Sequence, residues 1–253
     1  MTEFTLYHTN YDRSSCETGV AHIGLGAFHR AHQAVYIDDA MQATGDTRWG
    51  IAAVNLRAQD SGAFQDIAAA RDGYVVKTIA PDGTQNFRLV RSHVEFVDAA
   101  ADPDAGKNLF ARPSLSLATI TVTESGYYLD NDGKLDLDAA PVAAGIRGEN
   151  VETIYAFLAQ ALAHRAATIN APITIMCCDN IRSNGKMLEG ALITYIEARN
   201  NTALADWVRT NVTFPCSMVD RITPRSSPSL QDEISRINPD HDTPPDHAET
   251  YLQ

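Results

Sequence analysis

The stretch "AHIGLGAFHR" constrains the fold of this 253-residue chain more than any other. An apolar run that begins at Gly19 leads into two glycines, Gly24 and Gly26, and helical spacing follows. A turn of this kind needs a residue that tolerates positive φ, which Gly24 supplies. It also needs a position without a Cβ, Gly26, where an anion can approach the backbone. A strand, a glycine turn and a helix in this order predict a phosphate-binding turn.

The turn departs from the usual pattern, because its third glycine position holds His29. We expect Ala31 to take over the packing of the helix against the strand. An unrelated tight turn, or the glycine turn of a methyltransferase, would show a similar pattern. The predicted cofactor contacts in this stretch are Gly24, Gly26, Ala27, Phe28 and His29.

Two histidines, His29 and His32, lie three residues apart in the predicted helix, on a shared face. A metal site would need further ligands, and no carboxylate or cysteine lies at an adjacent spacing. We therefore expect packing or a phosphate contact, and no metal.

Short apolar runs alternate with helical patterns along the rest of the chain. This alternation predicts an α/β, Rossmann-like fold: a largely parallel twisted sheet with helices on both faces and inserted β-hairpins. Strands are expected at 19–24, 49–55, 93–98, 117–123, 173–178 and within 211–220, and hairpins at 74–90 and 126–137. Helices are expected at 27–41, 149–169, 187–198 and 203–208.

The segment from Asn238 to His247 is rich in proline and aspartate and predicts a linker. We assign residues 1–237 to a dinucleotide-binding domain, and residues 238–253 to this linker and the opening of a helix of a truncated second domain.

Composition excludes several classes of partner. Lys and Arg number 20 against 32 Asp and Glu, a net charge of −12 that disfavours nucleic acid. No apolar run approaches the ~20 residues that span a bilayer, and the polar N-terminus lacks a signal peptide. We expect a cytoplasmic protein without a membrane partner, and the oligomeric state stays open. The cysteine spacing fits neither a zinc ribbon nor a disulfide framework.

Polar residues at the carboxyl ends of the predicted strands are the next candidates, because ligands of open α/β sheets gather there. Arg57 and Asp60 follow the second strand, where an acid would bind a ribose and an arginine a 2′-phosphate, so NAD and NADP are both open. Glu124 and Asn180 follow later strands, and helix capping is their alternative role. Asp220 lies beside Arg221, with a surface ion pair as the alternative.

Five stretches together resemble the long-chain polyol dehydrogenases, the mannitol 2-dehydrogenase family. They are "HIGLGAFHRAHQA", "WGIAAVNLRAQD", "TVTESGYYLD", "CCDNIRSNG" and "SMVDRITPR", in the order of the family. Within it, "GLGAFHRAHQAVY", "GYYLD" and "DRITPR" look most like the D-arabinitol 4-dehydrogenase branch.

The resemblance implies a Rossmann domain followed by a helical substrate domain, and a metal-independent, NAD(P)-linked oxidation of a sugar alcohol or hexonate to its keto form. It implies that Asp60 binds the adenosine ribose, which favours NAD, although Gln59 stands where the family often has Glu. It further implies that Asn180 lies in the nicotinamide and substrate region, Glu124 near the proton exit path, and Asp220 at the edge of the site.

The family's catalytic base is a lysine in a K-x4-N-x2-H motif, and no lysine here is followed by that pattern. We therefore expect the cofactor half of such an enzyme, with weak or no turnover by these residues alone. The alternatives are a nucleotide-binding module without catalysis and a methyltransferase that uses S-adenosylmethionine.

Overall fold

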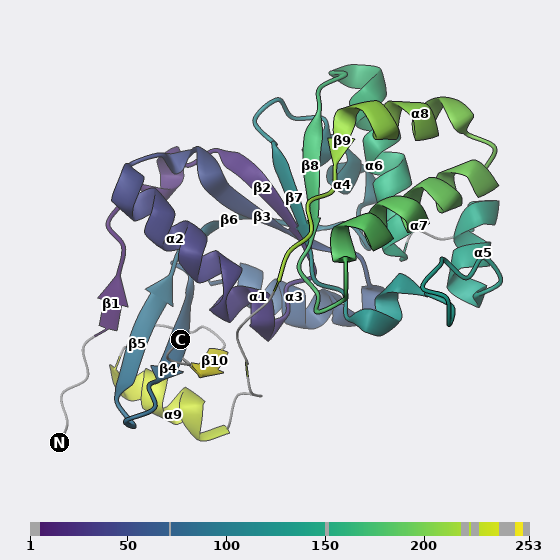
Figure 1. Cartoon of the computed structure of the whole chain (residues 1–253). Coiled ribbons are helices and arrows are strands. Elements are labelled where there is room, and N and C mark those ends of the chain that lie inside the picture. Colours follow the sequence, from purple (N-terminus) through teal and green to yellow (C-terminus); the bar gives the residue numbers. More distant parts are fainter. Residues whose placement is uncertain are drawn as a thin grey trace.

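The centre of the molecule is a six-stranded parallel sheet (Figure 1). The computed structural model describes residues 6–70, 72–149, 152–218, 223, 228–237 and 246–249. The strand order is β6-β3-β2-β7-β8-β9. The chain therefore adds β3 and β6 on one side of β2, then crosses to the other side of β2 and adds β7, β8 and β9. The strands are β2 (Thr18–Ile23), β3 (Gly50–Asn55), β6 (His93–Asp98), β7 (Leu117–Ile120), β8 (Ile173–Cys177) and β9 (Val212–Thr213).

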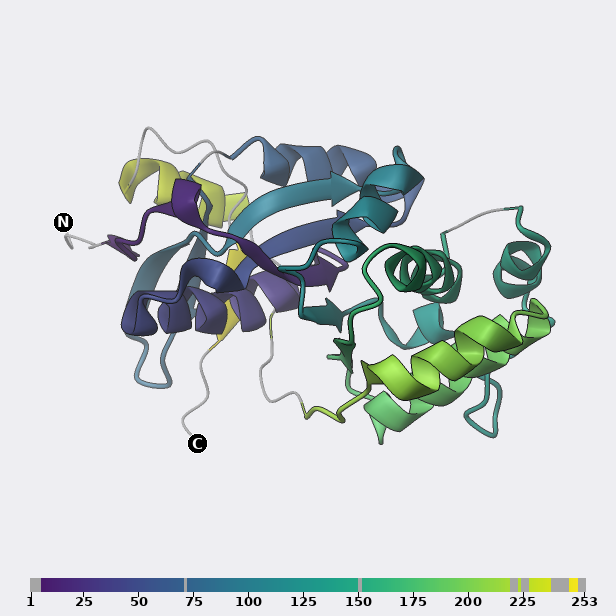
Figure 2. The same ribbon diagram turned by 90° about the horizontal axis from the view of Figure 1, so that it is seen from above.

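Helices cover both faces of this sheet, as Figures 1 and 2 show. Side chains alternate along β2: Val20 packs with Ala31 and Ala34 of the first helices, whereas Ala21 belongs to the core under the later helices. The α/β Rossmann-like prediction is confirmed. The helices are α1 (Ala27–Ala31), α2 (Gln33–Thr44), α3 (Ser61–Ala68), α4 (Pro103–Phe110), α5 (Ala140–Arg147), α6 (Ile154–Thr168), α7 (Asn184–Ala198), α8 (Thr202–Asn211) and α9 (Pro228–Ile237), with 3-10 turns η1 (Arg13–Ser15), η2 (Thr47–Trp49), η3 (Ala58–Asp60) and η4 (Glu124–Tyr127).

A second, four-stranded sheet lies beside the first, with the order β1-β5-β4-β10. The predicted hairpin at 74–90 is confirmed as an antiparallel pair in this sheet, and parallel strands flank it on both sides. Helix α9 covers it (Figure 2), and Leu230 and Ile234 of this helix share a buried cluster with Phe87 and Leu89. The strands are β1 (Leu6–His8), β4 (Tyr74–Ile79), β5 (Gln85–Val90) and β10 (Asp246–Glu249).

Three local expectations are corrected. The predicted helix 27–41 is two helices, because the backbone of His32 leaves helical geometry at φ −119° and ψ −91°. The predicted hairpin 126–137 is reduced to one bridge, between Leu129 and Leu135. Residues 246–249, expected in a linker and a helix start, form β10, which pairs with the open edge of β4. Residues 238–245 lie outside the described residues, so the domain boundary stays a prediction.

Three buried histidines lie between β2, β6 and α1. The rings of His22 and His29 stack with centroids 3.3 Å apart, and Nε2 of His29 lies 3.0 Å from Nε2 of His93. That hydrogen bond needs one ring as donor and the other as acceptor, so protonation of both rings would break it. Burial lowers the pKa of His22 to about 3 and holds the pKa values of His29 and His93 well below 6.5. The cluster is therefore neutral at neutral pH.

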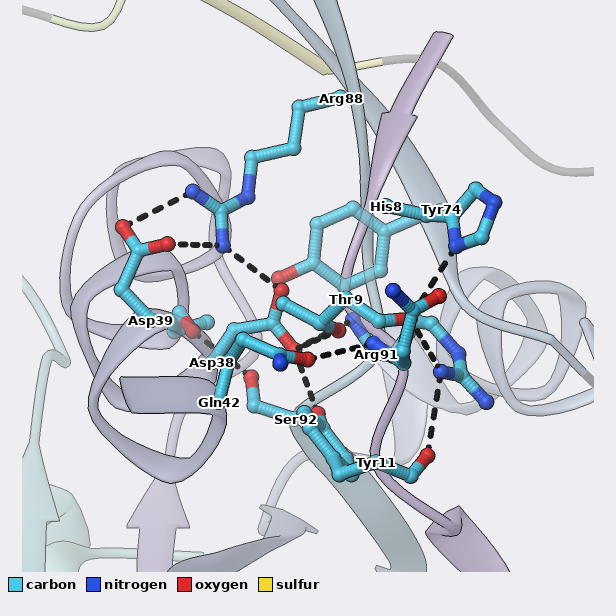
Figure 3. Close-up of polar contacts among 12 residues, drawn as sticks. His8, Thr9, Tyr11, Asp38, Asp39, Gln42, Tyr74, Arg88, Arg91 and Ser92 are labelled. Atoms are coloured by element: carbon cyan, nitrogen blue, oxygen red, sulfur yellow. Dashed lines mark hydrogen bonds and ion pairs between the residues drawn. The ribbon is translucent and has the colours of Figure 1, made fainter. Parts of the chain in front are cut away.

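Asp38 of α2 joins the N-terminal segment to the second sheet, as Figure 3 shows. Its carboxylate is fully buried and accepts hydrogen bonds from the hydroxyls of Thr9 and Tyr11 and from Arg88, the last at 2.8 Å. The backbone N–H of Arg91 donates to the same carboxylate. Burial, together with the hydrogen bond to Asp38, raises the pKa of Tyr11, so its phenol remains a donor.

The replacement Asp38→Ala should lower the free energy of unfolding by about 3–5 kcal/mol, because it leaves Arg88 and two hydroxyls without their buried acceptor. Asp39→Ala is the matched control: Asp39 pairs with the same Arg88, but its side chain is 50% exposed. That change should cost less than about 1 kcal/mol. Urea unfolding of both variants checks this, and equal losses would contradict the role of Asp38.

Because the histidine cluster is neutral in the native state, we expect the fold to lose stability in acid. As the pH falls from 6.5 to 5, the unfolded chain takes up protons that the native cluster excludes. The free energy of unfolding should fall by up to about 1.4 kcal/mol per pH unit for each histidine. Urea unfolding across this range should give a shallower pH dependence for His29→Gln than for the unaltered chain. Replacement of the exposed His8 by Gln is the control, and identical slopes in all three proteins would refute the prediction.

Candidate functional site

The carboxyl ends of β2 and β7 meet where the strand order reverses, the usual ligand position of an open α/β sheet. Gly24 follows β2 with φ +96°, and a Cβ on it would lie 2.1 Å from the carbonyl oxygen of Thr121. Only glycine fits there, on grounds of both conformation and space. The close approach brings the turn after β2 against the segment after β7.

Gly26 differs from Gly24 both in its backbone conformation and in the space around its Cα. Its φ is −73°, and a Cβ added to it would meet nothing within 4 Å. The fold itself therefore places no demand for glycine at this position, which opens to the surface at the start of α1. Ala27 and Phe28 follow it, partly buried. Ala31 is fully buried against Val20 and Ile51, which is the packing role expected of it.

His29 lies beneath this turn, with 1% of its surface exposed. Of the two roles expected for it, packing is observed, on His22 and His93. The ring also lines a small pocket beside the turn, and a phosphate contact stays a prediction. His32 stacks on Phe28. Among the described residues, no group of three or more His, Cys, Asp or Glu side chains is arranged to hold a metal ion.

A cleft of about 430 Å³ opens at the carboxyl ends of β7 and β8. It brings together two residues that the sequence singled out, Glu124 and Asn180, both exposed and on different loops. Its wall offers a carboxylate, an amide, a guanidinium and hydroxyls, together with the apolar side chains of Leu129 and Ile181. The lining residues are Glu124, Ser125, Tyr128, Leu129, Asn180, Ile181 and Arg182.

A smaller pocket of about 170 Å³ lies between the start of α2 and the ends of β7 and β8. Phe28, Thr121 and Cys178 contribute to its wall, so it adjoins the glycine turn. Burial raises the pKa of the Cys178 thiol to about 12. The thiol therefore stays protonated and is not a nucleophile at neutral pH.

Arg57 and Asp60 lie together at the carboxyl end of β3, the neighbour of β2. The Nε atom of Arg57 is 3.5 Å from Oδ2 of Asp60, and both side chains are more than half exposed. Asn55 shapes this loop, since its Nδ2 donates to the carbonyl of Arg57 at 3.0 Å and to Asp98 at 2.9 Å. Asp220, the remaining predicted site residue, lies outside the described residues, as does Arg221.

Sequence reasoning missed Asn184, which supports the loop that carries Asn180. Its Nδ2 donates to the carbonyls of Cys177 and Asp179, and its Oδ1 accepts from the backbone N–H of Ser217 at 2.9 Å. The signal was present in "SNG", a typical turn sequence, and Ser183 does adopt a positive φ of 53°.

Comparison with known proteins identifies the family of the chain. The mannitol dehydrogenase Rossmann domain model matches residues 18–253. A D-arabinitol 4-dehydrogenase of Klebsiella pneumoniae is 37% identical over 92% of the chain and 50% of its own length. A mannitol 2-dehydrogenase of Pyrenophora tritici-repentis is 35% identical over 89% of the chain and 40% of its own length. The chain thus spans about half the length of the curated relatives that it matches.

Two solved structures share the fold. A substrate-free D-sorbitol dehydrogenase superposes with a TM-score of 0.88 at 31% identity, over 98% of this chain and 51% of that one. The Pseudomonas fluorescens mannitol 2-dehydrogenase, solved as a ternary complex with NAD and D-mannitol, has a TM-score of 0.89 at 29% identity, over 100% and 51%. Among the described helices, none is both long and apolar enough to cross a membrane. The chain belongs to the mannitol dehydrogenase family, whose Rossmann domain it matches.

Proposed function

We propose that this chain binds NAD and forms the cofactor half of an oxidoreductase that interconverts a sugar alcohol, or a hexonate, and its keto form. The observation that carries the proposal is the contrast between the two glycines. The fold demands glycine at Gly24 but not at Gly26, where the missing side chain leaves open space beside the N-terminus of a helix. Support comes from the family match and from the related NAD complex.

Each part of the site has a matching part of the dinucleotide. The turn from Gly24 to Ala27 would take the pyrophosphate on backbone N–H groups. Asp60, beside β3, would accept hydrogen bonds from the adenosine ribose. The cleft with Glu124 and Asn180 would take the nicotinamide end and the substrate, a polyol or keto-sugar. Arg57 leaves NADP as a second possible cofactor.

When bound, NAD supplies the hydride acceptor, and the protein orients the reactants and handles the proton. In this scheme the amide of Asn180 orients groups at the nicotinamide end, and the carboxylate of Glu124 passes the hydroxyl proton outward. Asp220 stays a proposed residue at the edge of the site. The lysine motif of the family is absent from these 253 residues. We therefore expect cofactor binding with weak or no polyol oxidation by this chain alone.

The replacement Gly26→Val tests the phosphate-binding turn. It should lower the affinity for NAD at least about tenfold, because a branched side chain fills the space that the pyrophosphate needs. Thermal stability should fall only by the equivalent of about 1 kcal/mol, because an added Cβ meets nothing within 4 Å but valine is a poorer helix N-cap than glycine. Gly190→Ala in α7 is the matched control, because its added Cβ also meets nothing within 4 Å. Calorimetric titration with NAD, NADP and S-adenosylmethionine gives the affinities.

Two results of that titration would reject the proposal. Binding of S-adenosylmethionine alone would favour a methyltransferase. Equal NAD affinity in Gly26→Val and in Gly190→Ala would show that the pyrophosphate does not bind at this turn.

The replacement Asp60→Ala tests the choice between NAD and NADP. Loss of the carboxylate should weaken NAD binding by about tenfold, the usual effect of losing hydrogen bonds to a charged group. NADP binding should improve, because Arg57 loses its partner at 3.5 Å and becomes available to a 2′-phosphate. The exposed Asp66, changed to Ala, controls for the lost charge. If both variants keep the cofactor preference of the unaltered chain, Asp60 does not bind the ribose.

A further inference from the structure

The two loops that form the cleft are joined by one carboxylate, that of Asp179. Its Oδ2 atom accepts a hydrogen bond from the backbone N–H of Val122 at 2.9 Å and another from the hydroxyl of Tyr127 at 2.7 Å. Asp179 follows β8, whereas Val122 and Tyr127 follow β7. Asp179 itself is not among the residues that line the cleft.

These two hydrogen bonds fall at the ends of a strained turn. Thr123 has φ 69° and ψ 157°, and Tyr128 has φ 48° and ψ 47°, and these two residues bracket η4, which begins with Glu124. Residues other than glycine rarely adopt such angles, and they keep them only where the surrounding structure holds them. Val122 directly precedes Thr123, and Tyr127 directly precedes Tyr128. Asp179 therefore holds the turn next to both strained positions.

The carboxylate is anchored in the core from both sides. Tyr127 is fully buried, and its carbonyl accepts a hydrogen bond from the hydroxyl of Tyr155 at 2.9 Å. Burial, together with the neighbouring Cys177 and Asp179, raises the pKa of Tyr127, so the phenol remains a donor. On the other side, the amide of Asn184 donates to the carbonyl of Asp179 at 3.1 Å. A displacement of either loop would break at least one of these contacts.

We propose that Asp179 is a positioning residue, which holds η4 in its strained form and so keeps Glu124 and Tyr128 facing Asn180 across the cleft. The part of this inference that concerns what the cleft binds rests on the proposed function. The structural part does not, because it concerns only the backbone of residues 122–128.

Three variants test the contacts one by one. Asp179→Ala removes both hydrogen bonds to the carboxylate, and Asp179→Asn keeps an acceptor oxygen without the charge. Tyr127→Phe keeps the bond from Val122 and removes the one from the phenol, together with the contact of the phenol with the Cys177 thiol at 3.0 Å. Asn201→Ala is the control for a general loss of stability. It removes the helix cap at the start of α8, where Asn201 accepts from the N–H of Leu204, far along the chain from the cleft.

The first measurement is hydrogen exchange of residues 121–129 in the 253-residue protein. Asp179→Ala should speed exchange there about tenfold or more, because the lost bonds go to a charged acceptor. Tyr127→Phe should give a smaller increase and serves as the test if Asp179→Ala does not fold. Asp179→Asn should restore most of the protection. If Asp179→Ala exchanges this segment no faster than Asn201→Ala does, the inference is overturned. If Asp179→Ala does not fold, the same comparison is made with Tyr127→Phe.

The second measurement is the fluorescence of NADH at saturation, which reports how firmly the nicotinamide is held. Its emission should return toward that of free NADH in Asp179→Ala and remain unchanged in Asn201→Ala, with the affinity changed less than the emission. Unchanged emission in Asp179→Ala would overturn the functional part. If the unaltered chain binds no NADH, the proposed function fails, and hydrogen exchange alone decides whether Asp179 holds the turn.

Discussion

The close approach of β2 and β7 at their carboxyl ends is the constraint on which the rest of the site depends. The carbonyl oxygen of Thr121 occupies the place where any side chain on residue 24 would begin, 2.1 Å from an ideal Cβ. This contact coincides with the reversal of strand order, where the chain leaves β2 for one face of the sheet and β7 for the other. The glycine turn, η4 and the cleft are all built outward from it.

Beneath the exposed site residues lies a layer of buried polar groups that satisfy one another. His22 contacts the hydroxyls of Thr119 and Thr121 at 2.7 and 2.9 Å, and Thr119 donates in turn to Gln33 at the start of α2. Asn184 plays the same part under the loop after β8. Hydrogen bonds of this kind hold their loops in place, because each lost bond would leave a polar group buried without a partner. The loops that carry the exposed site residues are therefore held in place by buried hydrogen bonds.

Part of this organisation was readable from local patterns. Apolar runs predicted the core strands, and the run at 74–90 predicted its hairpin, because Pro81 to Gly83 is a turn sequence between β-branched segments. Other features had no local signal. Residues 246–249, from the far end of the sequence, pair with the edge of β4, and no pattern in these four residues predicts that pairing. The break at His32 likewise falls where spacing alone favoured one helix.

The sequence by itself determined the α/β class, the glycine turn and the presence of Glu124, Asn180, Arg57 and Asp60 at strand ends, because apolar periodicity and glycine placement are local properties. Tertiary structure alone decided that Glu124 and Asn180 share one cleft, that His29 packs on two other buried histidines, and that Asp179 bridges two loops 57 positions apart in the sequence. These depend on side chains brought together by strand order, and strand order depends on long-range packing that no short stretch of sequence encodes.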